Sequence, residues 1–511
     1  MPSFPRTASF WAKAGLAVGL VAVADGLVLV EFLGAGLGVF ALAVTGAALV
    51  ANPALRRSRL ALLALLIAEI LAALQIERAT VLGFFLFAAA IGVAALAPRA
   101  HAGDDAWRWL QRLVIGALKA VIGPFKDAQR LLKVRVRRRS LRVTAVLLAA
   151  ALPIVGGAVF LWLFAIANPV ISQALAALRV PELDVARLTF WGAVGGATWA
   201  VLRPRGLRRT TAAPGLNGEL DLLGVTTASV TVSLLVFNGL FALQNGLDIA
   251  YLWSGAPLPA GMTLAAYAHR GAYPLIATAL LAGLFVLVFL RPGSATGEAR
   301  WPRILVTAWV AQNLFLVAST ALRTLDYLEA YSLTRLRIAA LAWMALVAVG
   351  LALICWRLLR GKTSSWLINA NVLAAALVLA ACSVVDLGAV AAAWNVRHAR
   401  EVGGGAVALD VCYLSRLNGA AVVSLAELEQ RPLEPAFRAR VEWTRRILTA
   451  DLLKRQSDWR GWRWRDARRL DRVRALAGPD RPWRPGEPVG GCAPAPAPKP
   501  VQLTAPSQPG T

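Results

Sequence analysis

A small group of polar side chains borders one short loop near the middle of the chain. Asp248 follows a long apolar stretch, while Tyr267, His269 and Arg270 precede the next one. Because both stretches border the same loop, we expect these side chains to converge on one face of the fold. A histidine beside a carboxylate is suited to acid–base catalysis or to metal binding. No H-x-x-E-H, H-E-x-x-H or D-x-D spacing accompanies the group, so a role in fixing the loop is favoured over a defined reaction.

A second histidine and aspartate, His398 and Asp410, lie in the polar C-terminal part of the chain and are predicted on the same face. The chain has no Walker-type glycine loop, dinucleotide fingerprint, G-x-S-x-G elbow or kinase core. We therefore assign no catalytic, cofactor-binding or metal-ligating residue. An enzymatic interpretation rests only on the predicted outer-face group around His269 and Asp248, with His398 and Asp410 as possible additions.

Polar side chains also interrupt the apolar stretches themselves. The acids are Asp25, Glu69 and Asp386. Ionisable groups in hydrocarbon are costly, which makes each of them a functional hypothesis, such as part of a path for an ion, a proton or a small solute. The alternative, which we favour, is that they form interhelical hydrogen bonds or lie near helix ends, and Glu69 is the best candidate for a buried acid. Amides accompany the acids at Asn238, Gln244, Gln312, Asn313, Asn369 and Asn371.

The elements that carry these residues are long apolar segments separated by short basic loops. The 511 residues are 58% hydrophobic and only 16% charged, with a mean hydropathy of +0.61. A soluble domain of ordinary size cannot bury that much apolar surface, so lipid must be the solvent. The formal net charge of +26 is spread over the loops and not gathered on one domain, which argues against nucleic acid as a partner.

Windows of about 20 apolar residues predict eleven transmembrane helices. The predicted fold class is therefore all-α, a polytopic integral membrane helix bundle. The predicted spans are 11–30, 33–51, 60–76, 79–97, 142–166, 188–202, 221–244, 271–290, 303–322, 336–356 and 366–390.

The distribution of Lys and Arg predicts the orientation of these spans. The loops on one side carry 25 of these residues and the loops on the other side carry seven, with Arg323 counted among the seven. Because cytoplasmic loops retain cations, the N-terminus is predicted inside and the tail outside, in the inner membrane of a bacterium. Ala22-Val23-Ala24 resembles a signal-peptidase site, but the apolar stretch continues past Asp25, which favours an uncleaved first helix.

The predicted organisation has five parts. Residues 1–97 form four spans, 98–141 a basic cytoplasmic loop, 142–394 seven spans, 395–478 an extracytoplasmic helical tail, and 479–511 a disordered Pro-rich end. In the basic loop, apolar residues from Trp107 to Ile122 follow one helix face. This pattern predicts an interfacial helix that ends at Gly123-Pro124. The Lys and Arg residues after it favour anionic lipid at the cytoplasmic face, by about 1 kcal/mol per cation.

The tail carries helix-compatible segments around 409–417 and 436–453, followed by the indole–guanidinium pattern Trp459-Arg-Gly-Trp462-Arg-Trp464-Arg. In solution such a pattern is typical of nucleic-acid stacking. On the outer face it favours membrane-surface contact or Arg–Trp stacking, with packing inside the protein as a further alternative. A protein partner for the tail is also compatible with the sequence, and the oligomeric state stays open.

Several segments resemble a known family. Asp248-Ile-Ala-Tyr251-Leu-Trp, Met262 to Gly271 and Tyr331-Ser-Leu-Thr-Arg335 carry the resemblance, as do the segments that begin at Asn369, Asn395 and Leu409. Together they resemble the bacterial membrane proteins catalogued as domain of unknown function 4173, which is related to the 4153 type, over about 200–475. The resemblance implies a polytopic inner-membrane protein of uncharacterised function, and it supplies no catalytic residue.

These observations favour a non-enzymatic membrane protein with a sensor, assembly or scaffold role in the envelope. A transporter or channel is the second hypothesis, and an enzyme acting on lipid-linked substrates is the third. A transporter is expected to gather Glu69 and several amides around one cavity, whereas packing roles would scatter them over separate helix pairs. An enzyme is expected to bring His269 and Asp248 together with Asp410 or His398.

Overall fold

The computed structural model describes residues 4–28, 33–101, 103–139, 184–205, 210–211, 226–254 and 293–478, together with parts of 277–290. Within these ranges every regular element is helical, which confirms the all-α fold class. Seven of the described helices are long and apolar enough to cross a membrane.

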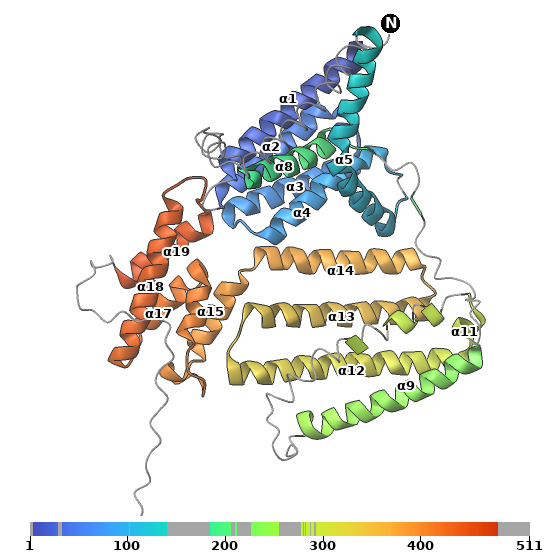
Figure 1. Cartoon of the computed structure of the whole chain (residues 1–511). Helices are drawn as coiled ribbons and strands as arrows, with labels where there is room; N and C mark the ends of the chain where they lie inside the picture. The colour runs from blue at the N-terminus through green and yellow to red at the C-terminus, as the bar shows by residue number, and fades with distance from the viewer. Residues whose placement is uncertain are drawn as a thin grey trace, which may run out of the picture.

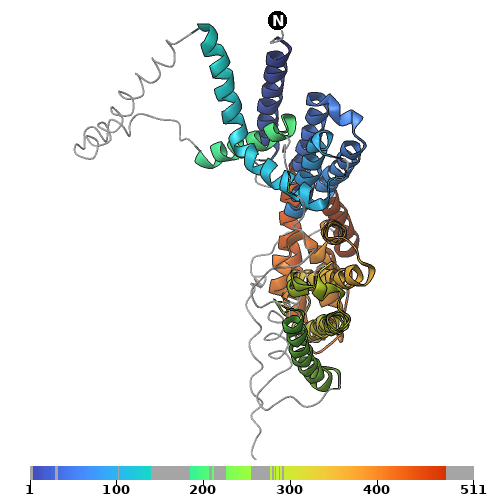
Figure 2. The same cartoon turned by 90° about the vertical axis from the view of Figure 1, so that its right-hand side faces the viewer.

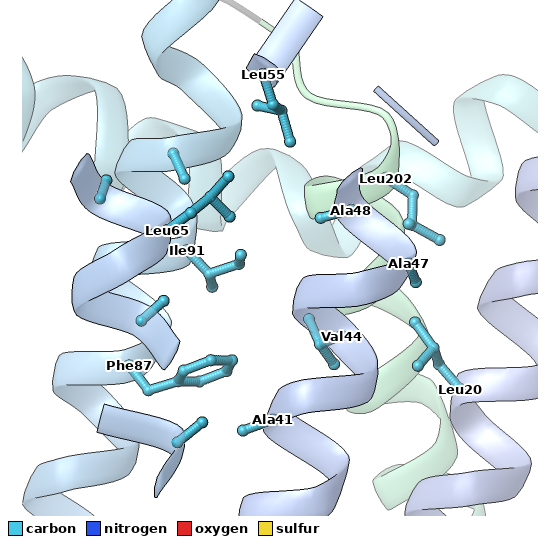
Figure 3. Close-up of a cluster of buried hydrophobic side chains, with 14 of the residues drawn as sticks. Leu20, Ala41, Val44, Ala47, Ala48, Leu55, Leu65, Phe87, Ile91 and Leu202 are labelled. Atoms are coloured by element: carbon cyan, nitrogen blue, oxygen red, sulfur yellow. The ribbon is translucent and has the colours of Figure 1, made fainter. Parts of the chain in front are cut away.

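The first helical bundle comprises α1 (Phe4–Leu27), α2 (Ala35–Ala51), α3 (Arg59–Glu77), α4 (Val81–Leu96) and α8 (Val185–Leu202). Its core mixes alanines with a few larger side chains, so the helix backbones approach closely (Figure 3). The opposite face of α3 exposes Leu62, Leu63, Leu66, Ile67 and Ile70. A contiguous apolar face of this size is stable against lipid and not against water. Two short 3-10 turns, Pro53–Arg57 and Ala97–Arg99, follow α2 and α4.

The second helical bundle comprises α9 (Thr227–Asp248), α12 (Arg300–Tyr331), α13 (Arg335–Arg360) and α14 (Ser364–Val384), which lie side by side (Figure 1). Trp309 of α12 packs against Phe237, Phe241 and Phe285 at ring distances of 5.2 to 5.6 Å. Hydroxyl caps from Thr226, Thr334 and Thr363 begin α9, α13 and α14. A π-helical turn, Ile249–Trp253, directly follows α9, and the short α11 (Ala295–Glu298) precedes α12.

The basic loop contains one long helix, α5 (Ala106–Arg139), which continues through Pro124. The prediction that this helix ends at Gly123-Pro124 is wrong. A proline removes one intrahelical hydrogen bond, but the residues on both sides keep theirs, so the helix resumes beyond it.

The tail domain comprises α15 (Leu387–Arg397), α16 (Val411–Arg416), α17 (Val422–Glu429), α18 (Pro435–Gln456) and α19 (Trp464–Ala477), with 3-10 turns at Arg400–Val402 and Asn418–Ala420. These helices bury a hydrophobic core that also includes Leu328 at the end of α12 and Leu333 between α12 and α13. Figure 1 shows the tail domain at one end of α12, α13 and α14, and Figure 2 views these helices from their other end. The helices predicted around 409–417 and 436–453 are present as α16 and α18. The predicted disordered end, 479–511, lies outside the described residues.

The seven candidate spans correspond to the predicted spans 11–30, 60–76, 79–97, 221–244, 303–322, 336–356 and 366–390. The predicted span 33–51 is the shorter apolar helix α2, and 188–202 is α8, which is not among the seven. Span 142–166 lies outside the described residues, and 271–290 is described only in part. The total of eleven therefore stays a prediction.

Two predicted boundaries are wrong in ways that move functional residues. Helix α12 continues past residue 322 to Tyr331, so Arg323, counted in an outer loop, lies inside a helix and is buried. Helix α14 ends at Val384, and Asp386 lies outside the span, where its carboxylate caps α15. For α12, hydropathy scores an arginine as a loop residue whether or not it has a buried partner. For α14, hydropathy does not detect that an aspartate within an apolar run caps a new helix.

The helix ends gather in two groups at opposite ends of the molecule. At one end, Lys13 Nζ donates to Asn52 Oδ1 at 3.1 Å and to the Leu202 carbonyl at 2.9 Å. At the other end, the tail domain contacts Leu33 and Glu77, which follow α1 and end α3. The chain therefore alternates between the two ends, as expected of helices that cross a membrane in turn (Figure 1).

Candidate functional site

The tail domain is joined to the membrane helices by charged contacts from α19. Arg465 Nη2 lies 2.9 Å from Glu77 Oε1 at the end of α3, and Arg468 Nη2 lies 3.3 Å from the same oxygen. Arg465 also donates to the Val384 carbonyl of α14 at 3.0 Å. One tail helix therefore contacts the end of α3 in the first bundle and the end of α14 in the second.

Asp386 completes this junction from the start of α15. Its carboxylate accepts hydrogen bonds from the backbone N–H groups of Gly388 and Ala389, and it pairs with Arg78 at 3.7 Å and with Arg469 of α19. Burial alone would raise the pKa of Asp386, but the two guanidinium groups and the backbone donors lower that pKa to about 2. The carboxylate is therefore ionised at any physiological pH. We call Glu77, Arg78, Asp386, Arg465, Arg468 and Arg469 the junction cluster.

The segment before α19 docks on the connection between α1 and α2 through backbone contacts. The Ala35 N–H donates to the Trp462 carbonyl at 2.7 Å, and the Gly36 N–H donates to the Arg460 carbonyl at 3.0 Å. Gly34 lies so close that a Cβ atom there would come within 2.2 Å of the Gly461 carbonyl oxygen. Only glycine permits this approach.

The Trp–Arg pattern of the tail therefore has mixed roles. Arg463 donates to the Leu33 carbonyl at 2.7 Å, which is packing inside the protein. Arg468 lies over the Trp464 ring at 4.1 Å, an example of the predicted Arg–Trp stacking. Trp459 is 57% exposed and free to contact the membrane surface.

A second polar group lies between the parallel helices α9 and α12. Asn238 Nδ2 donates to the Leu305 carbonyl at 3.0 Å, and Gln312 Nε2 donates to Asn238 Oδ1 at 3.0 Å. Two turns further along α9, Asn245 Nδ2 donates to the Gln312 carbonyl at 3.2 Å. The predicted amides Asn238 and Gln312 thus join these two helices directly.

The end of this interface formed by the last turn of α9 holds a buried ion pair. Asp248 is fully buried and pairs with Arg323, which is 3% exposed, while Gln244 Nε2 donates to Asp248 Oδ1 at 2.9 Å. Sequence reasoning missed Arg323 as the partner because it was read as a loop cation. The available signal was a lone arginine directly after an apolar run, opposite a lone acid on a neighbouring span. We call Asn238, Gln244, Asn245, Asp248, Gln312 and Arg323 the polar seam.

The remaining predicted acids have separate surroundings. Asp25 pairs with Arg187, whose Nε lies 2.7 Å from Asp25 Oδ1, and accepts a 2.8 Å hydrogen bond from the Trp191 indole. Glu69 is half-buried in the middle of α3 and has no hydrogen bond or ion pair within the described ranges. The best candidate for a buried acid thus lies at the edge of the bundle.

The predicted amides of α14 serve local contacts. Asn369 Oδ1 accepts from the Ala106 N–H at 2.7 Å and so holds the start of α5, whereas Asn371 donates to the Leu367 carbonyl of its own helix at 2.9 Å. Beside Asn369, Ser365 of the same helix donates to Asp105 at 2.8 Å. These contacts hold the basic loop against α14.

The outer-face His/Asp group is described only in part. Tyr267, His269 and Arg270 lie outside the described residues. His398 stacks on Trp394 with ring centroids 4.1 Å apart, and Asp410 accepts from the Tyr413 N–H at 2.8 Å as the cap of α16. In the part of the chain that the structure describes, no three His, Cys, Asp or Glu residues lie together in a way that could hold a metal ion.

The fold and the junction define a multi-spanning α-helical membrane protein with a helical domain docked on one end of its bundle. The model of the family described as "Domain of unknown function (DUF4153)" matches residues 59–428, and the chain belongs to this family. The sequence resemblance is to the 4173 type, which is related to the 4153 type. The family model that matches is that of the 4153 type. No curated protein and no solved structure matches the chain.

Proposed function

We propose that this protein is a scaffold or sensor of the bacterial cell envelope and not an enzyme. In this proposal its tail domain lies outside the inner membrane, where it couples the two helical bundles to an envelope partner. The observation that carries the proposal is that one tail helix, α19, contacts Glu77 of α3 and the Val384 carbonyl of α14 at the same time.

The electrostatics of the junction cluster support a regulated contact. Two carboxylates, Glu77 and Asp386, face four arginines, and Asp466 also pairs with Arg469, so the cluster keeps a small excess of positive charge in a partly solvated place. Such a contact is strong enough to hold the tail domain but can be loosened by a competing anion or a partner surface. A sensor needs a contact with this intermediate strength.

The scatter of three polar residues that the sequence placed within spans also supports a structural role. Asp25, Asn369 and Asp386 each serve a different pair of elements. This is the distribution expected of packing contacts. A single solute path would require these side chains to share one cavity.

The test measures how firmly the tail domain is held. Spin labels are attached at Val81→Cys on α4 and Asp471→Cys on α19, because both positions are exposed. The four native cysteines are replaced first, so that only these two positions carry a label. In lipid nanodiscs, the double variant Glu77→Gln with Asp386→Asn is expected to broaden the label–label distance distribution. The matched control Glu427→Gln removes only an exposed ion pair between α17 and Arg472 of α19, within the tail domain, and is expected to leave the distribution narrow.

An unchanged, narrow distribution in the double variant would show that the junction cluster does not hold the tail domain, and the proposal would fall. A label–label distance distribution that is already broad in the unmodified protein would likewise show that the junction cluster does not hold the tail domain.

The predicted contact with anionic lipid at the cytoplasmic face has support in the first bundle. Arg56, Arg57, Arg59 and Arg99 are exposed at the end opposite the tail domain and have no ion pair among the described residues. Cations without acidic neighbours attract the phosphates of anionic lipids. We expect this end to face the cytoplasmic leaflet.

A transporter is the second candidate, and the polar seam favours it. A fully buried Asp248–Arg323 pair within the membrane is the type of group that ion-coupled transporters use. The test is ion and proton flux into proteoliposomes. Flux that disappears in Asp248→Asn but survives in the Glu77→Gln, Asp386→Asn variant would replace the scaffold proposal with a transporter.

A further inference from the structure

A shallow cleft lies at the tail-side end of α1, where the membrane-spanning helix meets the loop before α19. Its volume is 480 Å³, and one wall is formed by Ala22, Val23, Gly26 and Leu27 of α1. Residues 458–460 of the tail domain form the other wall. A volume of this size is in the range of sites that hold small organic ligands.

The α1 wall is apolar and continuous with the lipid-facing surface of the helix. Val18, Ala22 and Gly26 follow one another at intervals of four residues and therefore lie on one helix face. Val18 and Val23 are exposed, and the candidate span of α1 ends at Leu27. The cleft therefore lies where a hydrocarbon surface gives way to the headgroup layer.

The tail wall brings a pair of opposite charges to the same depth. Asp458 and Arg460 lie 2.8 Å apart and are 38% and 39% exposed, so both retain accessible atoms. The hydrogen bond from Arg460 lowers the pKa of Asp458, which is therefore ionised at neutral pH. Arg460 Nη1 also donates to the Gly26 carbonyl at 3.2 Å, which fixes the guanidinium against the helix. Trp459 lies between the two charges in sequence, and indoles favour this depth of a membrane.

We propose that this cleft binds one phospholipid of the tail-side leaflet whose headgroup carries a primary ammonium, as phosphatidylethanolamine does. Arg460 donates to the lipid phosphate, Asp458 accepts from the ammonium, and an acyl chain lies along Val18, Ala22 and Gly26. A carboxylate beside a guanidinium complements a headgroup that carries both charges. A choline headgroup lacks the N–H donors that Asp458 accepts, and a glycerol headgroup lacks the positive charge.

The test uses photoactivatable acyl chains. The full-length protein is reconstituted in phosphatidylcholine vesicles that contain a small fraction of photoactivatable phosphatidylethanolamine, phosphatidylcholine or phosphatidylglycerol. After irradiation, mass spectrometry maps the labelled peptides. We expect labelling of the peptides that contain Ala22 to Leu27 and Trp459 to be several-fold higher with the ethanolamine lipid than with the other two.

A matched pair of variants tests the location. Gly26→Leu fills the cleft, and a Cβ atom added at this position meets no atom within 4 Å, so we expect the helix to fold normally. Gly46→Leu adds the same side chain in open space on α2, which contributes no residue to the lining of the cleft. Gly26→Leu is expected to lower labelling several-fold, whereas Gly46→Leu leaves it unchanged.

Asp458→Asn tests the headgroup. It is expected to remove the preference for ethanolamine over choline while labelling by both lipids persists. Equal labelling by all three lipids in the unmodified protein would overturn the proposal, as would equal labelling in Gly26→Leu and Gly46→Leu. Neither outcome depends on the junction cluster, so this test is independent of the proposed scaffold role.

Discussion

Asp386 has four charged or backbone partners, since Arg78, Arg469 and two backbone N–H groups surround its carboxylate. Its pKa falls from an ordinary value of 3.8 to about 2 in the folded protein. A carboxyl group whose folded pKa is depressed stabilises the fold above its unfolded pKa, and this contribution is lost as the pH falls through the folded pKa. The contribution, about 2 kcal/mol, should therefore be complete above pH 4 and decline towards pH 2.

The prediction is that Asp386→Asn lowers the stability of the docked tail domain at pH 7 and has little effect near pH 2. Limited proteolysis of the tail domain at both pH values measures this difference. Glu442→Gln, which removes an exposed pair with Arg446, serves as the control and should show no such pattern. A loss of equal size at both pH values would mean that the negative charge of Asp386 does not stabilise the fold, because asparagine can cap α15 equally well.

Glu69 is the opposite case, an acid in the middle of an apolar helix with no partner in the described part of the chain. An ionisable group near the bilayer centre costs roughly 2 to 3 kcal/mol. We expect Glu69→Leu to raise stability by about 1 to 3 kcal/mol, and Glu69→Gln to raise it less. Unfolding in mixed detergent micelles measures both. Destabilisation by Glu69→Leu would indicate that the carboxyl group has a partner in the assembled protein.

At the scale of elements, the α9–α12 interface depends on the pair of Asp248 and Arg323. Removal of one partner leaves the other charge buried, at a cost of about 3 to 5 kcal/mol. We expect Asp248→Asn to destabilise the protein by this amount and the double variant with Arg323→Gln to recover part of the loss. Unfolding of the single and double variants gives the coupling energy. Strictly additive losses would show that the two side chains do not act as a pair.

The connection between α1 and α2 depends on Gly34, because the tail backbone passes against it. A methyl group there would overlap the Gly461 carbonyl, and we expect Gly34→Ala to weaken tail docking by about 1 to 3 kcal/mol. Gly46→Ala in α2 adds a methyl group in open space and should be neutral or slightly stabilising. Proteolysis of the tail domain in both variants measures the effect, and equal cleavage would contradict the close approach.

At the scale of the whole molecule, the orientation predicted from the basic loops can be tested directly. Arg57→Cys and Arg474→Cys lie at opposite ends of the molecule and are both exposed. In a background without native cysteines, a membrane-impermeant maleimide added to intact bacterial cells is expected to label position 474 and not position 57. Labelling of both positions, or of position 57 alone, would reverse or remove the proposed topology.

The sequence by itself determined the solvent, the helical class and the identity of seven candidate spans, because hydrophobicity and loop charge are properties of short segments that need no partner to be read. It also nominated Asp248, Asn238 and Asp386 as unusual polar residues. Only the tertiary structure decided that Asp248 pairs with Arg323, that Asp386 pairs with Arg78 and Arg469, and that the tail packs against Gly34. These partners are separated by tens to hundreds of residues. Local sequence patterns show which polar and ionisable side chains are costly to bury. Folding decides which distant side chain or backbone group forms the ion pair or hydrogen bond that offsets this cost.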